Sequence, residues 1–280
     1  MDVSQWTNTP AIEAWLLGQS RRPDAELDLA QMALALAALA RPGSDVAPYA
    51  RHLEALARAA GEAGRAAPPA RQVAALNAVV FDQHGYRGDA ETYDDVANAD
   101  LMRVIDRKQG LPIALAILYL HAARGRGWAA EGINFPGHFL VRIGTGDAAL
   151  LVDPFERGAV RTQAELERLL KRMQGPEAAL AQEHLAVADN RDMLLRLQNN
   201  IKIRCLKQED HAGGLAAVER MALVAPALPG IWYEAATLNA ELGQLQRARV
   251  CLAAVVRLDP GGRRGREATT MLAELEKRLN

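Results

Sequence analysis

The sequence has no apolar stretch long enough to cross a membrane as a helix. A spanning helix needs about 20 consecutive apolar residues, and the longest candidate, Leu29 to Leu39, is too short and is interrupted by Gln31. The start of the chain also lacks a basic segment followed by an apolar one, which is the pattern of a secretory signal. We therefore expect a cytoplasmic protein that does not bind membranes.

The sequence also lacks an excess of charge of either sign, and it is poor in cysteine and serine. With 33 basic and 34 acidic residues the formal net charge is -1, so the overall charge does not favour binding to nucleic acid or to an anionic membrane. The two cysteines, Cys205 and Cys251, fall in helical patterns and fit no zinc-binding spacing. The three serines, Ser4, Ser20 and Ser44, all lie near the N-terminus. We expect no cofactor and no metal ion.

Helix-forming segments make up most of the chain. The hydrophobic residues account for 50% of the sequence, which is enough for a sizeable core. The apolar spacing and the glycine and proline breaks predict an N-terminal helical region (1–65), a mixed core (66–185) and a C-terminal helical region (186–280). The predicted helices of the first two regions are Ala11–Leu17, Asp24–Leu39, Val46–Ala60, Ala70–Phe81, Ala99–Asp106 and Pro112–Arg126, with a loose connection at Gly61–Pro69.

A β-like stretch lies in the middle of the chain. The predicted strands are Glu131–Phe135, His138–Ile143 and Ala148–Val152. If residues 144–147 close a regular hairpin, Ile143 pairs with Ala148 and His138 lies directly opposite Asp153. Partners across antiparallel strands have Cβ atoms about 5 Å apart, so the imidazole would meet the carboxylate. Such a pair is either the base and its orienting carboxylate in a catalytic triad or a structural hydrogen bond that closes the hairpin.

The C-terminal region contains a repeat. Pro226 and Pro260 are 34 residues apart, which is the period of tetratricopeptide repeats. Gly243 supplies a turn between two helices, and the signature positions hold Trp232, Ala235, Ala236, Asn239, Ala248 and Leu252. Only Asn239 departs from the signature, where an aromatic residue is usual. The alternative is an ordinary helical hairpin, with the same packing but no groove for a ligand.

Several short motifs together resemble the SirB regulator family. They are Leu76-Asn77, Gly85-Tyr86-Arg87-Gly88, Tyr93, Asn98, Arg107, Gly110-Leu111-Pro112-Ile113, Phe135 to Arg142 and Val152 to Phe155. The resemblance covers roughly residues 25–260. It implies an α+β fold: N-terminal helices, a small antiparallel sheet with a core helix as in transglutaminases and papain, and C-terminal tetratricopeptide-type repeats. It also implies a regulatory role but does not specify a chemical reaction.

The same resemblance implies that the catalytic nucleophile is missing. Enzymes of the transglutaminase superfamily carry a cysteine at the N-terminus of the core helix, where the helix dipole favours the thiolate. Counting back from Gly127, that position is Pro112. Proline suits the first turn of a helix but has no nucleophilic atom. The predicted remnant of the catalytic site is therefore His138 with Asp153.

Other polar residues are candidates for binding. Asn77, Asn98 and Arg107 either line a cleft beside Pro112 or tie the irregular segment 84–98 to the core, because the backbone groups of such a segment need partners. Asn134 lies at the cleft end of its strand and is a stronger candidate. His84 could join the histidine–aspartate pair as a metal ligand, but no further ligands are apparent.

Three functions fit these observations. The first is a non-catalytic binding or regulatory protein, a pseudoenzyme whose cleft holds a peptide or another ligand and whose repeats bind a protein partner. The second is a hydrolase or acyltransferase of altered mechanism, with His138 as general base and Asp153 orienting it. The third is a scaffold in which side chains close the pocket. The absence of a nucleophile favours the first.

Overall fold

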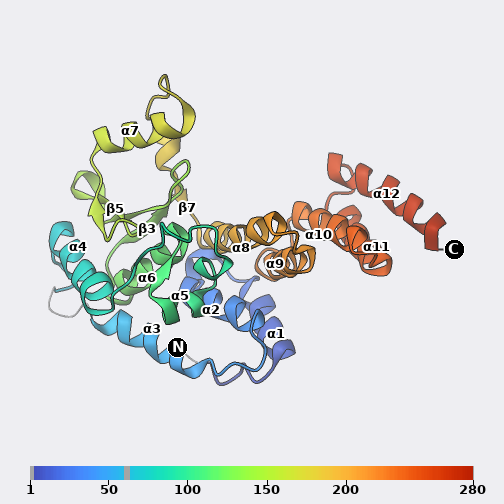
Figure 1. The fold of residues 1–280 in the computed structure, drawn as a ribbon, viewed down its shortest axis with the longest axis horizontal. Helices are drawn as coiled ribbons and strands as arrows, with labels where there is room; N and C mark the ends of the chain where they lie inside the picture. Colours follow the sequence, from blue (N-terminus) through green and yellow to red (C-terminus); the bar gives the residue numbers. More distant parts are fainter. Residues whose placement is uncertain (1–2, 60–63, 280) are drawn as a thin grey trace.

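The computed structural model describes residues 3–59 and 64–279. It has the predicted fold class, with helices at the N-terminal end, a small antiparallel sheet packed against a central helix, and a helical tail that extends away from the sheet (Figure 1). The predicted connection Gly61–Pro69 falls partly on residues 60–63, outside the described residues. The N-terminal helices are α1 (Thr9–Gln19), α2 (Leu29–Leu39), α3 (Ala47–Ala59) and α4 (Pro69–Asn77).

The second of these helices is shorter than the predicted Asp24–Leu39. Asp24–Glu26 forms a 3-10 turn, and α2 begins after Asp28, whose carboxylate accepts a hydrogen bond from the backbone N–H of Gln31 at 3.0 Å. An aspartate at this position satisfies an N–H group that has no partner inside the helix. The chain therefore starts a new helix at Leu29 instead of continuing an earlier one.

The segment between α4 and the sheet is irregular, and it leads into the central helix. A π-helical turn (Ala78–Gln83) extends α4, and the short strands β1 (Arg87–Gly88) and β2 (Gln109–Gly110) pair in parallel on either side of α5 (Leu101–Arg107). The central helix, α6 (Pro112–Gly125), follows β2, and nearly all its side chains are buried. Proline in the first turn of α6 and Gly127, with a φ of 69°, just past its end delimit the helix as predicted.

The main sheet among the described residues has the strand order β6-β5-β4-β3-β7, and all its neighbours are antiparallel. The helix α6 packs against one face, and α7 (Gln163–Gln174) covers the other through Leu166 and Leu170. The sequence does not predict β6 and β7, because two residues are too few to show an alternating pattern. The strands are β3 (Ala130–Ile133), β4 (Leu140–Ile143), β5 (Leu150–Asp153), β6 (Ala159–Val160) and β7 (Val187–Ala188).

The β4–β5 hairpin has a different register from the predicted one. Ile143 pairs with Leu150 and not with Ala148, so the prediction is wrong by two residues. Gly144 and Gly146, with φ values of 89° and 62°, allow the wider loop. Because side chains alternate with a period of two, this shift leaves every side chain of the hairpin on its predicted face.

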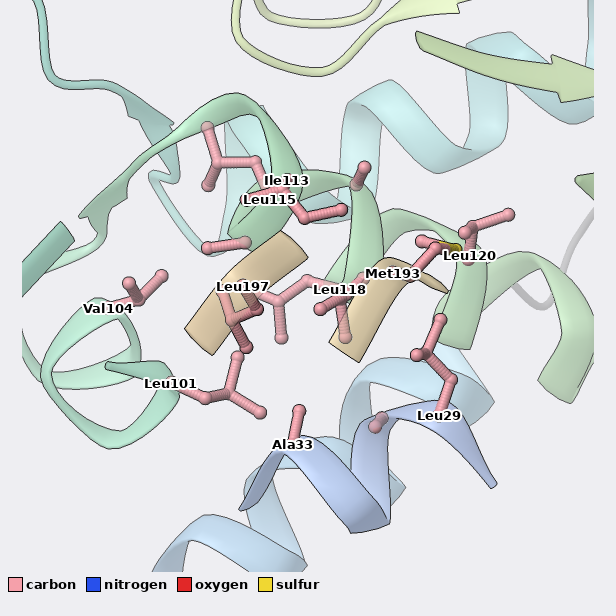
Figure 2. Packing of buried hydrophobic residues seen from close by; sticks show 14 of the residues in the cluster. Leu29, Ala33, Leu101, Val104, Ile113, Leu115, Leu118, Leu120, Met193 and Leu197 are labelled. Carbon is pink, nitrogen blue, oxygen red and sulfur yellow. The ribbon is translucent and has the colours of Figure 1, made fainter. Parts of the chain in front are cut away.

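The tail is joined to the core by its first helix. The helices of the tail are α8 (Asn190–Lys207), α9 (His211–Val224), α10 (Pro229–Glu241), α11 (Leu245–Leu258) and α12 (Arg263–Leu279), each packed on the next. Met193 and Leu197 of α8 enter the central core beside Leu29 and Ala33 of α2 (Figure 2), so the N-terminal helices, the sheet and α8 share one core. A second apolar cluster lies within α9–α12. The boundaries at residues 65 and 185 stay predictions.

Candidate functional site

The structure places His138 and Asp153 in contact on the face of the sheet that α7 covers. The Nε2 atom of His138 lies 2.8 Å from Oδ2 of Asp153. The guanidinium of Arg161 donates to the same oxygen from Nε at 3.0 Å and from Nη2 at 2.6 Å. The second oxygen of Asp153 accepts from the backbone N–H groups of Phe155 and Glu156. The buried carboxylate is therefore fully hydrogen-bonded. A catalytic role for the pair stays a prediction.

His138 reaches Asp153 from a turn and not from the predicted strand. Its backbone N–H donates to the carbonyl of Phe135, and the preceding Gly137 has a φ of 67°. A glycine adopts this conformation without strain. The side chain of Met173, on α7, packs closely over Gly137, so any side chain there would meet it. The short turn and α7 together fix the position of the imidazole.

The charges at this contact determine which histidine nitrogen carries the proton. Burial alone would raise the pKa of Asp153, but the hydrogen bonds and charges of His138 and Arg161 outweigh it and hold the pKa below its usual value. An ionised carboxylate can only accept, so Nε2 of His138 must be the donor. Nδ1 is then the atom with the free lone pair of the neutral ring, and the described residues form no hydrogen bond with it.

A pocket of about 240 Å³ opens beside this pair. Among the described residues that line it there is no thiol and no hydroxyl; the others are Glu156, Arg161, Glu165, Arg168, Leu169 and Arg172. Pro112 is buried at the start of α6 and is not part of this lining. Both cysteines lie in the tail helices, and burial raises the pKa of each thiol, so neither is a reactive thiolate.

The ring of Phe155 contacts both His138 and Gly88 of β1. The two rings meet edge to face with their centroids 6.3 Å apart. The Phe155 ring also lies over Gly88, where a Cβ atom would be 2.7 Å from three ring carbons. Tyr93 packs edge-on against the same ring at 6.0 Å. The glycine at position 88 is thus explained by the space that the aromatic ring needs.

Three of the residues predicted to bind a ligand are engaged inside the protein. Asn77 donates to the carbonyl of Gly158 and accepts from the hydroxyl of Tyr119. Asn98 and Arg107 both donate to the carboxylate of Asp89, at 3.0 and 3.2 Å, and so hold the irregular segment in place. These contacts fit the structural alternative given above, and a binding role for the three residues stays a prediction.

Asn134 is not among the residues that line the pocket beside His138. Its Oδ1 atom accepts a hydrogen bond from Nη1 of Arg196 on α8, and Nη2 of Arg196 donates to the carbonyl of His138 at 3.0 Å. Sequence reasoning missed both Arg161 and Arg196. Neither shows a local signal, because Arg196 is 58 residues from His138 and meets it only in the folded chain.

No group of three or more histidine, cysteine, aspartate and glutamate side chains in the described part of the chain could hold a metal ion. His84 packs against His52, with ring centroids 5.1 Å apart. Within residues 3–59 and 64–279, no helix is both long and apolar enough for a membrane span.

Comparison with known proteins identifies both parts of the chain. Residues 47–199 match the family model of the transglutaminase-like superfamily. The chain belongs to this superfamily. Residues 201–274 match the tetratricopeptide repeat, which confirms the repeat predicted from Pro226 and Pro260.

Similar proteins occur in bacteria and in animals. A UPF0162 protein of Xylella fastidiosa (strain 9a5c) is 31% identical over 193 residues, 68% of each chain. A UPF0162 protein of Vibrio cholerae is 30% identical over 140 residues, 50% of this chain and 52% of that one. Human F-box only protein 21 is 36% identical over 104 residues, 34% of this chain and 17% of that one. Another UPF0162 protein, from Xylella fastidiosa (strain Temecula1), matches over 47% of its length, so the chain spans about half of some of these relatives.

Proposed function

We propose that this transglutaminase-like protein is a non-catalytic binding module, with the tetratricopeptide helices recruiting a protein partner. The observation that carries this proposal is a histidine–aspartate pair beside which the described residues place no thiol or hydroxyl. Removal of the nucleophile from such a unit costs many orders of magnitude in rate. The regulatory role of the SirB type and the cytoplasmic location that the sequence favours belong to the same proposal.

The second partner of Asp153 supports a non-catalytic role. A carboxylate helps a histidine base by stabilising the imidazolium that forms when the ring takes up a proton. Here Arg161 already neutralises the carboxylate through two hydrogen bonds to the oxygen that His138 uses. The attraction left for an imidazolium is correspondingly weaker. The ion pair serves as a clamp that holds the turn of His138 against β5.

A pure scaffold is less well supported. Side chains would then fill the space beside the histidine, whereas a pocket of about 240 Å³ is open there. The tail also presents apolar side chains to solvent, such as Ile203 (42% exposed) on α8 and Val250 (62% exposed) on α11. Exposed apolar groups on stacked helices suit protein recognition.

Affinity capture with the full chain tests the proposal. Partners recovered by the wild type would be compared with those of Ile203→Asp, Val250→Asp and His138→Ala. We expect at least one partner to be lost on changing the tail. Recovery that none of the three substitutions alters would contradict a binding role for both parts.

One observation favours a second candidate, a hydrolase of altered mechanism. With Nε2 of His138 engaged by Asp153, Nδ1 forms no hydrogen bond with any residue that the structure describes and could take a proton from water. The pH–rate profile of p-nitrophenyl ester hydrolysis, measured for the wild type and for His138→Ala, distinguishes the two. A rate that rises through the titration of a histidine, and is absent in the variant, would establish this candidate and exclude the first.

A further inference from the structure

A second and larger pocket, of about 610 Å³, lies where the sheet meets the tail. This junction groove is lined by Asn134, Phe139, Ala188, Asp192, Leu195, Arg196, Asn199, Asn200 and Met221. Asp192, Leu195, Arg196 and Asn199 follow helical spacing and so lie on one face of α8. The volume falls within the range of about 300–1,000 Å³ that is usual for ligand sites.

The polar groups of the groove divide into those used by the protein and those left free. Asn200 donates to the carbonyl of Arg196 and accepts from Arg204, so its amide is occupied. The side chains of Asp192 and Asn199 have no hydrogen bond or ion pair to any described residue. The groove therefore offers one free carboxylate and one free amide, which can donate and accept at once as a peptide group does.

The guanidinium of Arg196, the cation of the groove, is held by contacts within the protein. Arg196 donates to the Asn134 side chain and to the carbonyl of His138, and its guanidinium stacks on the ring of Phe139 at 5.3 Å. Partial loss of solvent, followed by the charges of Asp189 and Asp24, raises the pKa of Asp192. The charges of Asp189 and Asp24 thus make the surroundings of the Asp192 carboxylate more negative, which favours a cationic group at this carboxylate.

Apolar side chains also line the groove. Phe139, Leu195 and Met221 give the groove an apolar floor between its polar groups. We propose that the junction groove binds an extended peptide segment, with a lysine or arginine side chain paired to Asp192 and a peptide group bonded to Asn199. This inference rests on the proposed function, because it supplies the chemistry of the partner.

Arg196 connects the junction groove to His138. The same guanidinium borders the groove and holds the carbonyl of His138 at 3.0 Å. A peptide that packs on Arg196 would shift this contact and with it the turn that carries the imidazole. Arg196 is thus a positioning residue between the groove and the His138 pocket.

Affinity selection from capped pentapeptide libraries tests the proposal. Three libraries would be mixed at four positions and fixed at the central one as lysine, norleucine or glutamate. We expect the lysine library to be enriched over norleucine by about two- to fivefold, as a single exposed ion pair provides, and over glutamate by more. Asp192→Asn should abolish this preference, whereas Glu177→Gln, an exposed acid outside the groove, should preserve it.

The imidazole signal of His138 in NMR spectra gives a second readout. It should shift when a selected lysine peptide binds the wild type. In Arg196→Lys, which keeps the charge but loses the two-pronged contact, the peptide should still bind and the shift should be smaller.

Three results would overturn the inference: no enrichment of any library, equal enrichment of lysine and glutamate, or a preference unchanged in Asp192→Asn. A protein that captures a partner without turnover but binds no peptide here would refute the groove and leave the proposed function intact. Turnover that depends on His138 would refute the proposed function instead.

Discussion

Replacement of Asp153 by asparagine is expected to destabilise the protein by about 2–4 kcal/mol at pH 7. The new amide group would face the N–H groups of His138 and Arg161, which now donate to Oδ2 of the carboxylate. A hydrogen bond to a charged group contributes about 1.5–3 kcal/mol, and removal of one partner of a buried ion pair costs about 3–5 kcal/mol. His138 and Arg161 keep 17% and 20% exposure, so water recovers part of the loss.

The effect also has a defined pH dependence. The pKa of Asp153 is lower in the folded protein than in the unfolded chain, so its contribution is present above the unfolded value of about 3.9 and is lost as the pH falls below it. The difference between wild type and variant should be complete at pH 7 and should shrink below about pH 4.

Urea unfolding of the two proteins at pH 7 and at pH 3.5 measures both quantities. The exposed Asp147, in the turn between β4 and β5, provides the control, because Asp147→Asn should change the free energy of unfolding by less than about 0.5 kcal/mol. A cost below about 1 kcal/mol for Asp153→Asn at pH 7, well under the range expected for a buried pair, would refute the clamp described here. So would a cost that does not depend on pH.

Three more predictions follow from neighbouring contacts. Gly88→Ala should displace the ring of Phe155, because the new methyl group would lie 2.7 Å from three ring carbons; unchanged ring-proton shifts would contradict this packing. His52, bonded to Tyr86 at 2.7 Å, has its pKa lowered from 6.5 to about 4, chiefly by burial. The protein should therefore become less stable as the pH falls from 6.5 towards 4. The His52→Gln variant should lose less stability over this range, and thermal unfolding of both proteins at pH 7 and pH 5 would measure the difference. A cysteine in place of the buried Pro112 should react with Ellman's reagent only after denaturation, and rapid labelling of the folded variant would show that the start of α6 is open.

The sequence allowed the main elements to be predicted where the signal is local. Proline at the start and glycine after the end delimited α6 correctly, because both residues act through their own backbone conformations. The predicted register of the β4–β5 hairpin was wrong, because Gly144 and Gly146 permit loops of more than one length. The contact of His138 with Asp153 exists despite that error, because the turn at Gly137, and not the predicted strand pairing, brings the imidazole to the carboxylate.

The surroundings of the site could not be predicted in the same way. Arg161 comes from the end of β6, a strand too short to recognise, and Arg196 comes from the tail. Phe155 was part of a motif, but its role depends on the space above Gly88, which only the folded chain reveals. Contacts between residues distant in sequence leave no periodic pattern. The sequence thus indicated the histidine–aspartate pair but not the ion pair and the aromatic ring beside it.

The most direct test of a non-catalytic core is a search for acyl chemistry by mass spectrometry. A glutamine-containing peptide would be incubated with the wild type and an excess of a primary amine, and with His138→Ala in parallel. We expect that neither the hydrolysed peptide nor the amine adduct accumulates above the level seen without protein. Either product, formed by the wild type and absent with His138→Ala, would contradict it.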